Sequence, residues 1–218
     1  MNLIIDTSSE KLKVILKGNN VFLENEETNM KHLQHLLPQI DKILQKANIS
    51  VKDLKLLSVV LGPGSFTGVR IGVSTVKAFM CAHPHIKAIG VNMLELLSYV
   101  IIKNLKVSTN FAIIIKSTST KYYFAVSSST GVLQKQTLLT SSELEEFLKE
   151  NKMPLFSYNI EYKTEQNCAT IITLSTSDYV EFVDQLVFKK AFSQDLKPIY
   201  LALSQAEEEL LKRENKTV

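Results

Sequence analysis

Glycines crowd one short segment of this chain. Four of the seven glycines lie in Gly62-Pro63-Gly64-Ser65-Phe66-Thr67-Gly68-Val69-Arg70-Ile71-Gly72. A turn between a strand and a helix N-terminus can bind phosphate through free backbone N–H groups. However, a Walker motif needs a lysine after its last glycine, and a dinucleotide motif needs glycine where Thr67 stands. A nucleophile elbow needs its serine between two glycines, but Ser65 follows both. None of these three motifs is therefore present.

Packing is the simpler interpretation of these glycines. Gly68 and Gly72 are four residues apart and share one helix face, which Thr75 and Val76 continue. The rest of the predicted helix is apolar on nearly every side, which indicates burial on every side. One sheet covers only one side, so we expect a second chain, or alternatively the second half of this chain, to cover the other. In the turn itself, Gly62 and Gly64 are predicted to serve backbone conformation.

An acid and hydroxyl groups follow the first predicted strand, as Asp6-Thr7-Ser8-Ser9. This is the position of the phosphate loop in actin-like ATPase folds, which need a second glycine-rich loop in their second half. Here residues 101–218 contain only Gly131. We therefore interpret Asp6, Thr7 and Ser8 as a vestigial nucleotide site. Asp6 is either a vestigial or a structural carboxylate, and in the structural role it would cap local N–H groups. ATP hydrolysis by this chain alone is not expected.

Four histidines are the other candidates for chemistry. His32 and His35 are three residues apart on a predicted helix, a spacing that can share a metal ion. Apart from Asp41 that helix offers no nearby acid, and no second ligand pair is visible. His83 and His85 flank a proline. We predict solvated or interface histidines, with no metal, no cofactor and no catalytic residue.

Composition narrows the class of protein. The chain has 218 residues, a net charge of +3, and only two arginines among 25 basic residues. This argues against an autonomous nucleic-acid binder and leaves room for a weak basic surface. Cys81 and Cys168 are too few for a disulfide scaffold. The start of the chain has no signal-peptide pattern, and no apolar run is long enough to span a membrane. We expect a cytoplasmic protein with no membrane partner.

Two α/β halves must position these residues. Each half is predicted to begin with three strands and then to alternate helix and strand, so each should contain parallel pairs. The expected domains are residues 1–103 and 104–218, and residues 207–218 are expected to fray. The predicted strands are 2–6, 12–16, 21–24, 56–61, 86–91, 111–116, 121–127, 132–139, 154–158 and 169–174. The predicted helices are 29–47, 65–82, 93–103, 141–149 and 178–192.

The glycine-rich segment strongly resembles the signature of the bacterial TsaB (YeaZ) family. Its residues Gly62, Pro63, Gly64, Ser65, Phe66 and Thr67 form the signature turn. The flanks agree: Ile4-Ile5-Asp6-Thr7-Ser8 resembles the family's first strand, and His32 with Leu36-Leu37-Pro38-Gln39-Ile40 resembles its first helix. Pro198-Ile199-Tyr200-Leu201 resembles its Pro-x-Tyr-Leu segment. The resemblance is specific over about residues 1–100 and loose afterwards.

The resemblance implies a two-lobed actin-like α/β fold (the ASKHA, ribonuclease H-like group) with a degenerate nucleotide site. It implies a non-catalytic scaffold that supports TsaD, the subunit that transfers threonylcarbamoyl to adenosine 37 of tRNA. The resemblance also implies that TsaE joins a ternary complex, that the chain alone forms a homodimer, and that tRNA is bound weakly or only indirectly. The first two helices would contact TsaD or a second copy. The interface residues so implied are His32, Leu33, Leu36, Leu37, Ile40, Gly68, Val69, Gly72, Thr75, Val76 and Phe79.

Some residues depart from the family pattern. The family's second lobe usually starts with an Asp-Ala-Arg-like turn, where this chain has Lys116-Ser117-Thr118-Ser119, and Ala202 stands where an arginine is common. The alternative hypothesis is an enzyme in its own right, either a glycoprotease-like metallopeptidase or a small-molecule kinase of the actin-like group. The catalytic relatives carry a His-x-x-x-His metal pair. Here His32 and His35 are off register, which favours the scaffold.

Overall fold

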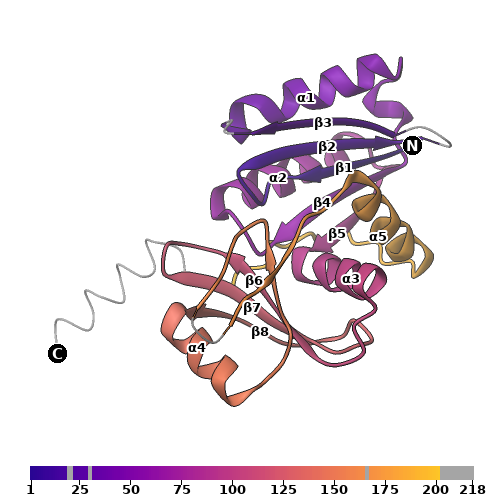
Figure 1. Cartoon of the computed structure of the whole chain (residues 1–218). Helices are drawn as coiled ribbons and strands as arrows, with labels where there is room; N and C mark the ends of the chain where they lie inside the picture. The colour runs from indigo at the N-terminus through magenta and orange to yellow at the C-terminus, as the bar shows by residue number, and fades with distance from the viewer. Residues whose placement is uncertain (19–21, 29–30, 165–166, 202–218) are drawn as a thin grey trace, which may run out of the picture.

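Two mixed β-sheets form the frame of the molecule in the computed structural model (Figure 1). The structure describes residues 1–18, 22–28, 31–164 and 167–201. Each sheet has five strands, and helices cover the faces of both. The predicted α/β class is therefore confirmed. The fraying predicted for residues 207–218 lies outside the described residues.

The first sheet has the strand order β3-β2-β1-β4-β5. β1, β2 and β3 form an antiparallel meander, and β4 and β5 add parallel strands on the other side of β1. β1 reads Asn-Leu-Ile-Ile-Asp and is buried along its whole length, as expected for a central strand. The bounds are β1 (Asn2–Asp6), β2 (Lys11–Lys17), β3 (Phe22–Thr28), β4 (Leu56–Gly62) and β5 (Lys87–Asn92).

The second sheet repeats this arrangement, with β6 in the place of β1 and the order β10-β9-β6-β7-β8. Its first three strands are again an antiparallel meander, and β9 and β10 are again parallel. The predicted repeat of architecture, typical of the two-lobed actin-like fold, is confirmed. The bounds are β6 (Phe111–Lys116), β7 (Lys121–Ser127), β8 (Leu133–Thr140), β9 (Leu155–Tyr158) and β10 (Thr170–Ile172).

The helices divide between outer and inner faces. α1 (His32–Lys46) and α2 (Phe66–Ala82) cover one face of the first sheet, and α4 (Ser141–Glu150) covers the outer face of the second. α3 (Met93–Leu105) and α5 (Thr176–Phe188) pack in the core that the two sheets share, and a short 3₁₀ helix, η1 (Val51–Asp53), precedes β4. The prediction of a last helix over 178–192 was displaced, because a Ser175 cap starts α5 early and a left-handed Lys190 ends it.

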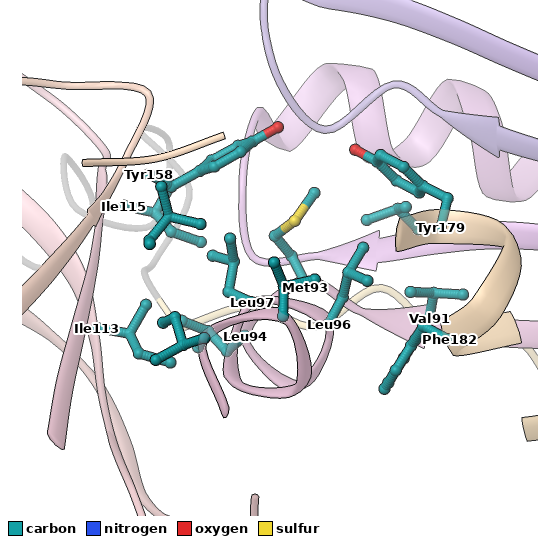
Figure 2. Close-up of a cluster of buried hydrophobic side chains, with 14 of the residues drawn as sticks. Val91, Met93, Leu94, Leu96, Leu97, Ile113, Ile115, Tyr158, Tyr179 and Phe182 are labelled. Carbon is teal, nitrogen blue, oxygen red and sulfur yellow. The ribbon is translucent and has the colours of Figure 1, made fainter. Parts of the chain in front are cut away.

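α3 is the element that joins the two sheets. Leu94, Leu96 and Leu97 are fully buried, although they point to different sides of the helix. One side packs on β5 and the other on β6. Figure 2 shows these leucines between Ile113 on the second sheet and Phe182 of α5. The two sheets therefore share one apolar core through α3.

The glycine face of α2 packs inside this chain, so the expectation that it meets a second chain is wrong. A Cβ on Gly68 would lie 2.0 Å from the carbonyl oxygen of Thr7, and one on Gly72 would lie 2.5 Å from Thr7 Oγ1. Val69 and Val76 are buried in the same core. The glycines let α2 lie directly on the end of β1.

The end of the described chain returns to the first sheet. Ser193 donates its backbone N–H to the carbonyl of Ala88, and Ile199 donates to that of Leu61. Leu196 between them is buried in the core under α1 and α2. The domain boundary at residues 103 and 104 stays a prediction, and it falls in the last turn of α3. Across the described ranges, none of the helices combines the length and the apolar character needed to span a membrane.

We expect Gly72→Leu to destabilise the chain. The leucine would overlap Thr7 and Val59, and overpacking costs ~1–3 kcal/mol, occasionally more. The gain in helix propensity, up to ~1 kcal/mol, offsets part of this cost. Thermal and urea unfolding of the purified variant measure the change. Ala78→Leu is the control, because Ala78 is exposed on the same helix and should change stability by about 0.5 kcal/mol at most. Equal melting temperatures for the two variants would contradict this packing.

Candidate functional site

The signature turn is built against the loop that follows β1. Gly62 has φ +101°, a conformation that favours glycine. A Cβ on Gly64 would lie 2.2 Å from the carbonyl oxygen of Ser8, and Ser65 donates its backbone N–H to that same oxygen at 2.6 Å. Both glycines thus have the conformational role expected of them. The turn and the Ser8 loop are therefore packed directly against each other.

Side chains distant in sequence contact the signature turn on its other side. Tyr123 of β7 donates its hydroxyl to the carbonyl of Gly64 at 3.1 Å. Arg70 lies 3.8 Å from the ring centroid of Phe66 and donates through Nε to the hydroxyl of Tyr200 at 2.8 Å. The rings of Phe66 and Tyr200 are 4.7 Å apart. Sequence reasoning used Tyr200 only as part of a motif and gave Arg70 no role, since their contact spans 130 residues.

A cleft of about 1370 Å³ opens beside the turn. Its walls come from both sheets: residues 8–11 and 63–70 of the first, and residues 115–119 and 158–161 of the second. Hydroxyl side chains and lysines lie in its lining among apolar residues such as Ile115, Leu138 and Ile160. In the part of the chain that the structure describes, no group of three or more His, Cys, Asp or Glu side chains is arranged to hold a metal ion.

Asp6 is engaged by its own neighbours. One carboxylate oxygen accepts from the backbone N–H and the hydroxyl of Ser8, at 2.8 and 2.6 Å, and the other accepts from the Tyr179 hydroxyl at 2.6 Å. The side chain of Tyr179 is fully buried, and Asp6 is 3% exposed. The interpretation of Asp6 as a structural carboxylate that caps a local N–H is confirmed. Thr7, by contrast, has a buried hydroxyl without a hydrogen-bond partner in the described structure.

Charged residues of β2 and β3 form a cluster of ion pairs close to Asp6 and Tyr179. Lys13 pairs with Glu24 at 2.9 Å and with Glu26 at 2.8 Å, and Lys11 also pairs with Glu26. Burial by itself lowers the pKa of Lys13, but its bonds to the two glutamates outweigh that effect and raise the pKa overall. Hydrogen bonds from Lys11 and Lys13 lower the pKa of Glu26. The cluster lines a cavity of about 80 Å³ beside Tyr179, and its charges are largely satisfied internally.

Only some of the residues that the resemblance assigns to a partner interface lie on the surface. Leu33 and Leu37 of α1 are 76% and 55% exposed, so their side chains are available to a partner. His32 is half-buried, and its Nε2 lies 2.7 Å from the carbonyl oxygen of Ser9. Thr75 and Phe79 are also half-buried.

The remaining predicted interface residues lie in the interior, so their assignment to a surface is wrong. On α1, Leu36 and Ile40 face the sheet, while Leu33 and Leu37 point outward. Successive residues are about 100° apart around a helix, so Leu36 and Leu37 cannot both face the sheet. The buried set is Leu36, Ile40, Gly68, Val69, Gly72 and Val76.

We expect Tyr179→Phe to destabilise the chain without changing its fold. The substitution removes a buried hydroxyl and leaves one oxygen of Asp6 without its donor, which costs about 1–3 kcal/mol. Urea unfolding measures the loss. Tyr200→Phe is the matched control, because that hydroxyl is exposed and should matter by about 0.5 kcal/mol at most. Equal unfolding midpoints for Tyr179→Phe and the unmodified chain would show that the bond contributes little.

Stability should also fall at alkaline pH. Burial, and then the charge of Asp6, raise the pKa of Tyr179 well above its ordinary value near 10. The folded chain thus keeps a proton that the unfolded chain loses, so this contribution is complete below about pH 10 and declines above it. The free energy of unfolding, measured in urea from about pH 8 to 11, should fall above pH 10. The fall should be shallower for Tyr179→Phe, and identical slopes would exclude Tyr179 as a cause.

Solved structures with the same architecture include two from Pseudomonas aeruginosa. One, a protein described as similar to the peptidase YeaZ, superposes with a TM-score of 0.72 over 92% of this chain and 99% of its own. The other, YeaZ itself, gives a TM-score of 0.68 over the same shares. Both are 19% identical to this chain. The whole two-sheet fold, including the loose second half, is therefore shared with these proteins.

Sequence relatives include the tRNA threonylcarbamoyladenosine biosynthesis proteins TsaB of Buchnera aphidicola (strain Sg) and Escherichia coli K12. The first is 32% identical over 97 residues, 44% of this chain and 46% of the relative. The second is 36% identical over 93 residues, 42% and 40% of the two chains. The chain thus spans about half the length of the curated relatives it matches. These matches confirm the resemblance to TsaB proteins.

The model of one family matches a longer stretch. That family is described as TsaD, tRNA N6-adenosine threonylcarbamoyltransferase, and the match covers residues 24–193. It runs from β3 through the signature turn, both inner helices and the whole of the second sheet. Because this match takes in well over half of the sequence, the chain belongs to the TsaD family of tRNA N6-adenosine threonylcarbamoyltransferases.

Proposed function

We propose that the chain is a non-catalytic subunit that binds a catalytic TsaD and supports threonylcarbamoyl transfer to adenosine 37 of tRNA. The observation that carries this proposal is the state of Asp6. Its two oxygens already accept hydrogen bonds from Ser8 and Tyr179, which supports a structural role for this carboxylate. A member of this family with a closed acidic site is better suited to assisting a catalytic relative than to transferring the group itself.

The outer surface of α1 supports a partner role. Leu33 and Leu37 are four residues apart, lie on one helix face, and are both exposed. α1 packs on α2, where Phe79 is half-buried. Exposed leucines that gather on one face indicate a contact with another protein. TsaB is the name of the matching relatives, and a matching relative from Cytophaga hutchinsonii, 39% identical over 64 residues, is a tRNA N6-adenosine threonylcarbamoyltransferase.

The finer partner assignments follow from the same proposal. The chain alone would form a homodimer through the α1 face, and TsaD would compete for that face. TsaE would join the heterodimer in a ternary complex. The net charge of +3 with only two arginines supports weak contact with tRNA. The chain would act in the cytoplasm, where tRNA is modified.

We expect Leu33→Asp with Leu37→Asp to weaken the complex with TsaD. Charges on an apolar contact must be desolvated, and losing two anchor residues should raise the dissociation constant by at least about tenfold. Sizing chromatography and calorimetry with purified TsaD measure the binding, and transfer to tRNA in a reconstituted assay should fall with it.

Leu105→Asp is the control for this pair. Leu105 is 46% exposed at the end of α3, away from α1. It should bind TsaD like the unmodified chain. If the α1 double variant also binds TsaD normally, the interface lies elsewhere. If the unmodified chain does not bind TsaD at all, the proposed function is wrong.

A further inference from the structure

The C-terminal end of α5 carries an aromatic side chain with almost no cover. Phe188 is 89% exposed, more than any other large apolar side chain in the described ranges. Phe192 follows four residues later and is 39% exposed. Lys189 and Lys190 lie between the two rings and are exposed as well. A phenylalanine this exposed gains almost none of the free energy that burial of its ring would supply.

The backbone at this end of α5 is hydrogen-bonded, so the exposure of Phe188 does not come from a frayed helix end. The N–H of Lys190 donates to the carbonyl of Val187, and that of Ala191 donates to the carbonyl of Leu186, both at 2.9 Å. Ser193 then donates to Ala88 of β5 at 2.9 Å. The segment is tied at both ends, and Phe188 points out of an ordered turn.

Lysines accompany the two rings, and one of them contacts the ring of Phe192. Lys87 Nζ lies 4.8 Å from the ring centroid of Phe192. Within the described residues, no ion pair is formed by Lys87, Lys189 or Lys190. Three acidic residues lie on or beside this stretch. Burial raises the pKa of Glu95 and Lys189 lowers it to a smaller degree, while Asp184 pairs with Lys17, and Asp195 pairs with Lys77 and Lys197. Because the carboxylates of Asp184 and Asp195 have their own lysine partners, Lys87, Lys189 and Lys190 leave the surface with an excess of positive charge.

We propose that Phe188, Phe192, Lys87, Lys189 and Lys190 form a surface that binds an unpaired segment of RNA. Unpaired bases stack on aromatic rings, and lysines contact the phosphates between them. The inference rests on the proposed function, in which the substrate is a tRNA. Insertion into a membrane is disfavoured, because the apolar face of α5 is already buried in the core through Tyr179, Val180, Phe182 and Val183.

The position of this surface fits a role beside a protein partner. α5 packs in the core on the face of the first sheet opposite α1 and α2 (Figure 1). A partner bound to Leu33 and Leu37 would therefore leave the Phe188 surface open. RNA and partner could bind at the same time.

The test is fluorescence anisotropy with the full chain and a labelled anticodon stem-loop RNA at low salt. Phe188→Ala should weaken binding about five- to 150-fold, the range that corresponds to one stacked base. Phe188→Trp, which keeps a stacking ring, should restore it. Lys189→Ala with Lys190→Ala should weaken binding and lower the slope of log affinity against log salt by about 0.7 for each phosphate that a lysine no longer neutralises.

Lys149→Ala with Lys152→Ala is the charge-matched control, since both lysines are exposed near α4 and should not matter. The proposal would be overturned if this control weakened RNA binding as much as the Phe188 and lysine variants do. It would also be overturned if the unmodified chain did not bind the stem-loop. It would also be overturned if Phe188→Ala weakened binding to a polyglutamate peptide or to phosphatidylglycerol vesicles and left RNA binding unchanged. If Phe188→Ala does not fold, the lysine double variant decides alone.

The same variants separate this inference from the proposed function. Phe188→Ala should still bind TsaD with unchanged affinity. If the complex forms but RNA binding does not depend on Phe188 or its lysines, only the RNA surface is wrong. If RNA binding depends on Phe188 and TsaD does not bind the unmodified chain, only the subunit role is wrong.

Discussion

The close approach of α2 to the loop after β1 is the contact on which the remaining structure depends. Positions 64, 68 and 72 all lie where a Cβ would overlap Ser8 or Thr7, at 2.2, 2.0 and 2.5 Å. Glycine at these positions lets the helix sit directly on the strand end. That placement sets the signature turn against the Ser8 loop and brings the buried Thr7 hydroxyl against Gly72. One steric constraint therefore sets the packing of α2, the turn and the loop that follows β1.

α3 and α5 join the two sheets by packing in one shared apolar core. A helix that buries residues on more than one side needs cover on each of these sides, and α3 finds it between β5 and β6. α5 comes after the second sheet in the chain, yet Tyr179 and Phe182 bury their rings in the core shared with the first (Figure 2). Residues 193–201 then return to β4 and β5.

The same packing bears on function. A carboxylate at the end of β1 faces the cleft region in an actin-like fold, but here Tyr179 and Ser8 take its two oxygens. The surfaces left for interaction are apolar on α1, around Leu33 and Leu37, and aromatic with lysines at the end of α5. They lie on opposite faces of the first sheet. A subunit that contacts a protein on one face and RNA on the other is consistent with a family that acts on tRNA.

The sequence by itself determined the α/β class, nearly every helix and strand, the repeat of two similar halves and the structural role of Asp6. Local periodicity and the hydroxyls next to Asp6 carry that information over a few residues. It also located the signature turn and the need for glycine at positions 62 and 64. The partner-facing residues were only partly predictable. Periodicity shows that a helix has an apolar stripe but not what covers it, and the tertiary structure turned Leu36, Ile40, Gly68 and Gly72 inward while leaving Leu33 and Leu37 outside. Contacts over long sequence separations, such as Tyr179 with Asp6 and Arg70 with Tyr200, were decided by the tertiary structure alone, because no local pattern records which distant groups a fold brings together.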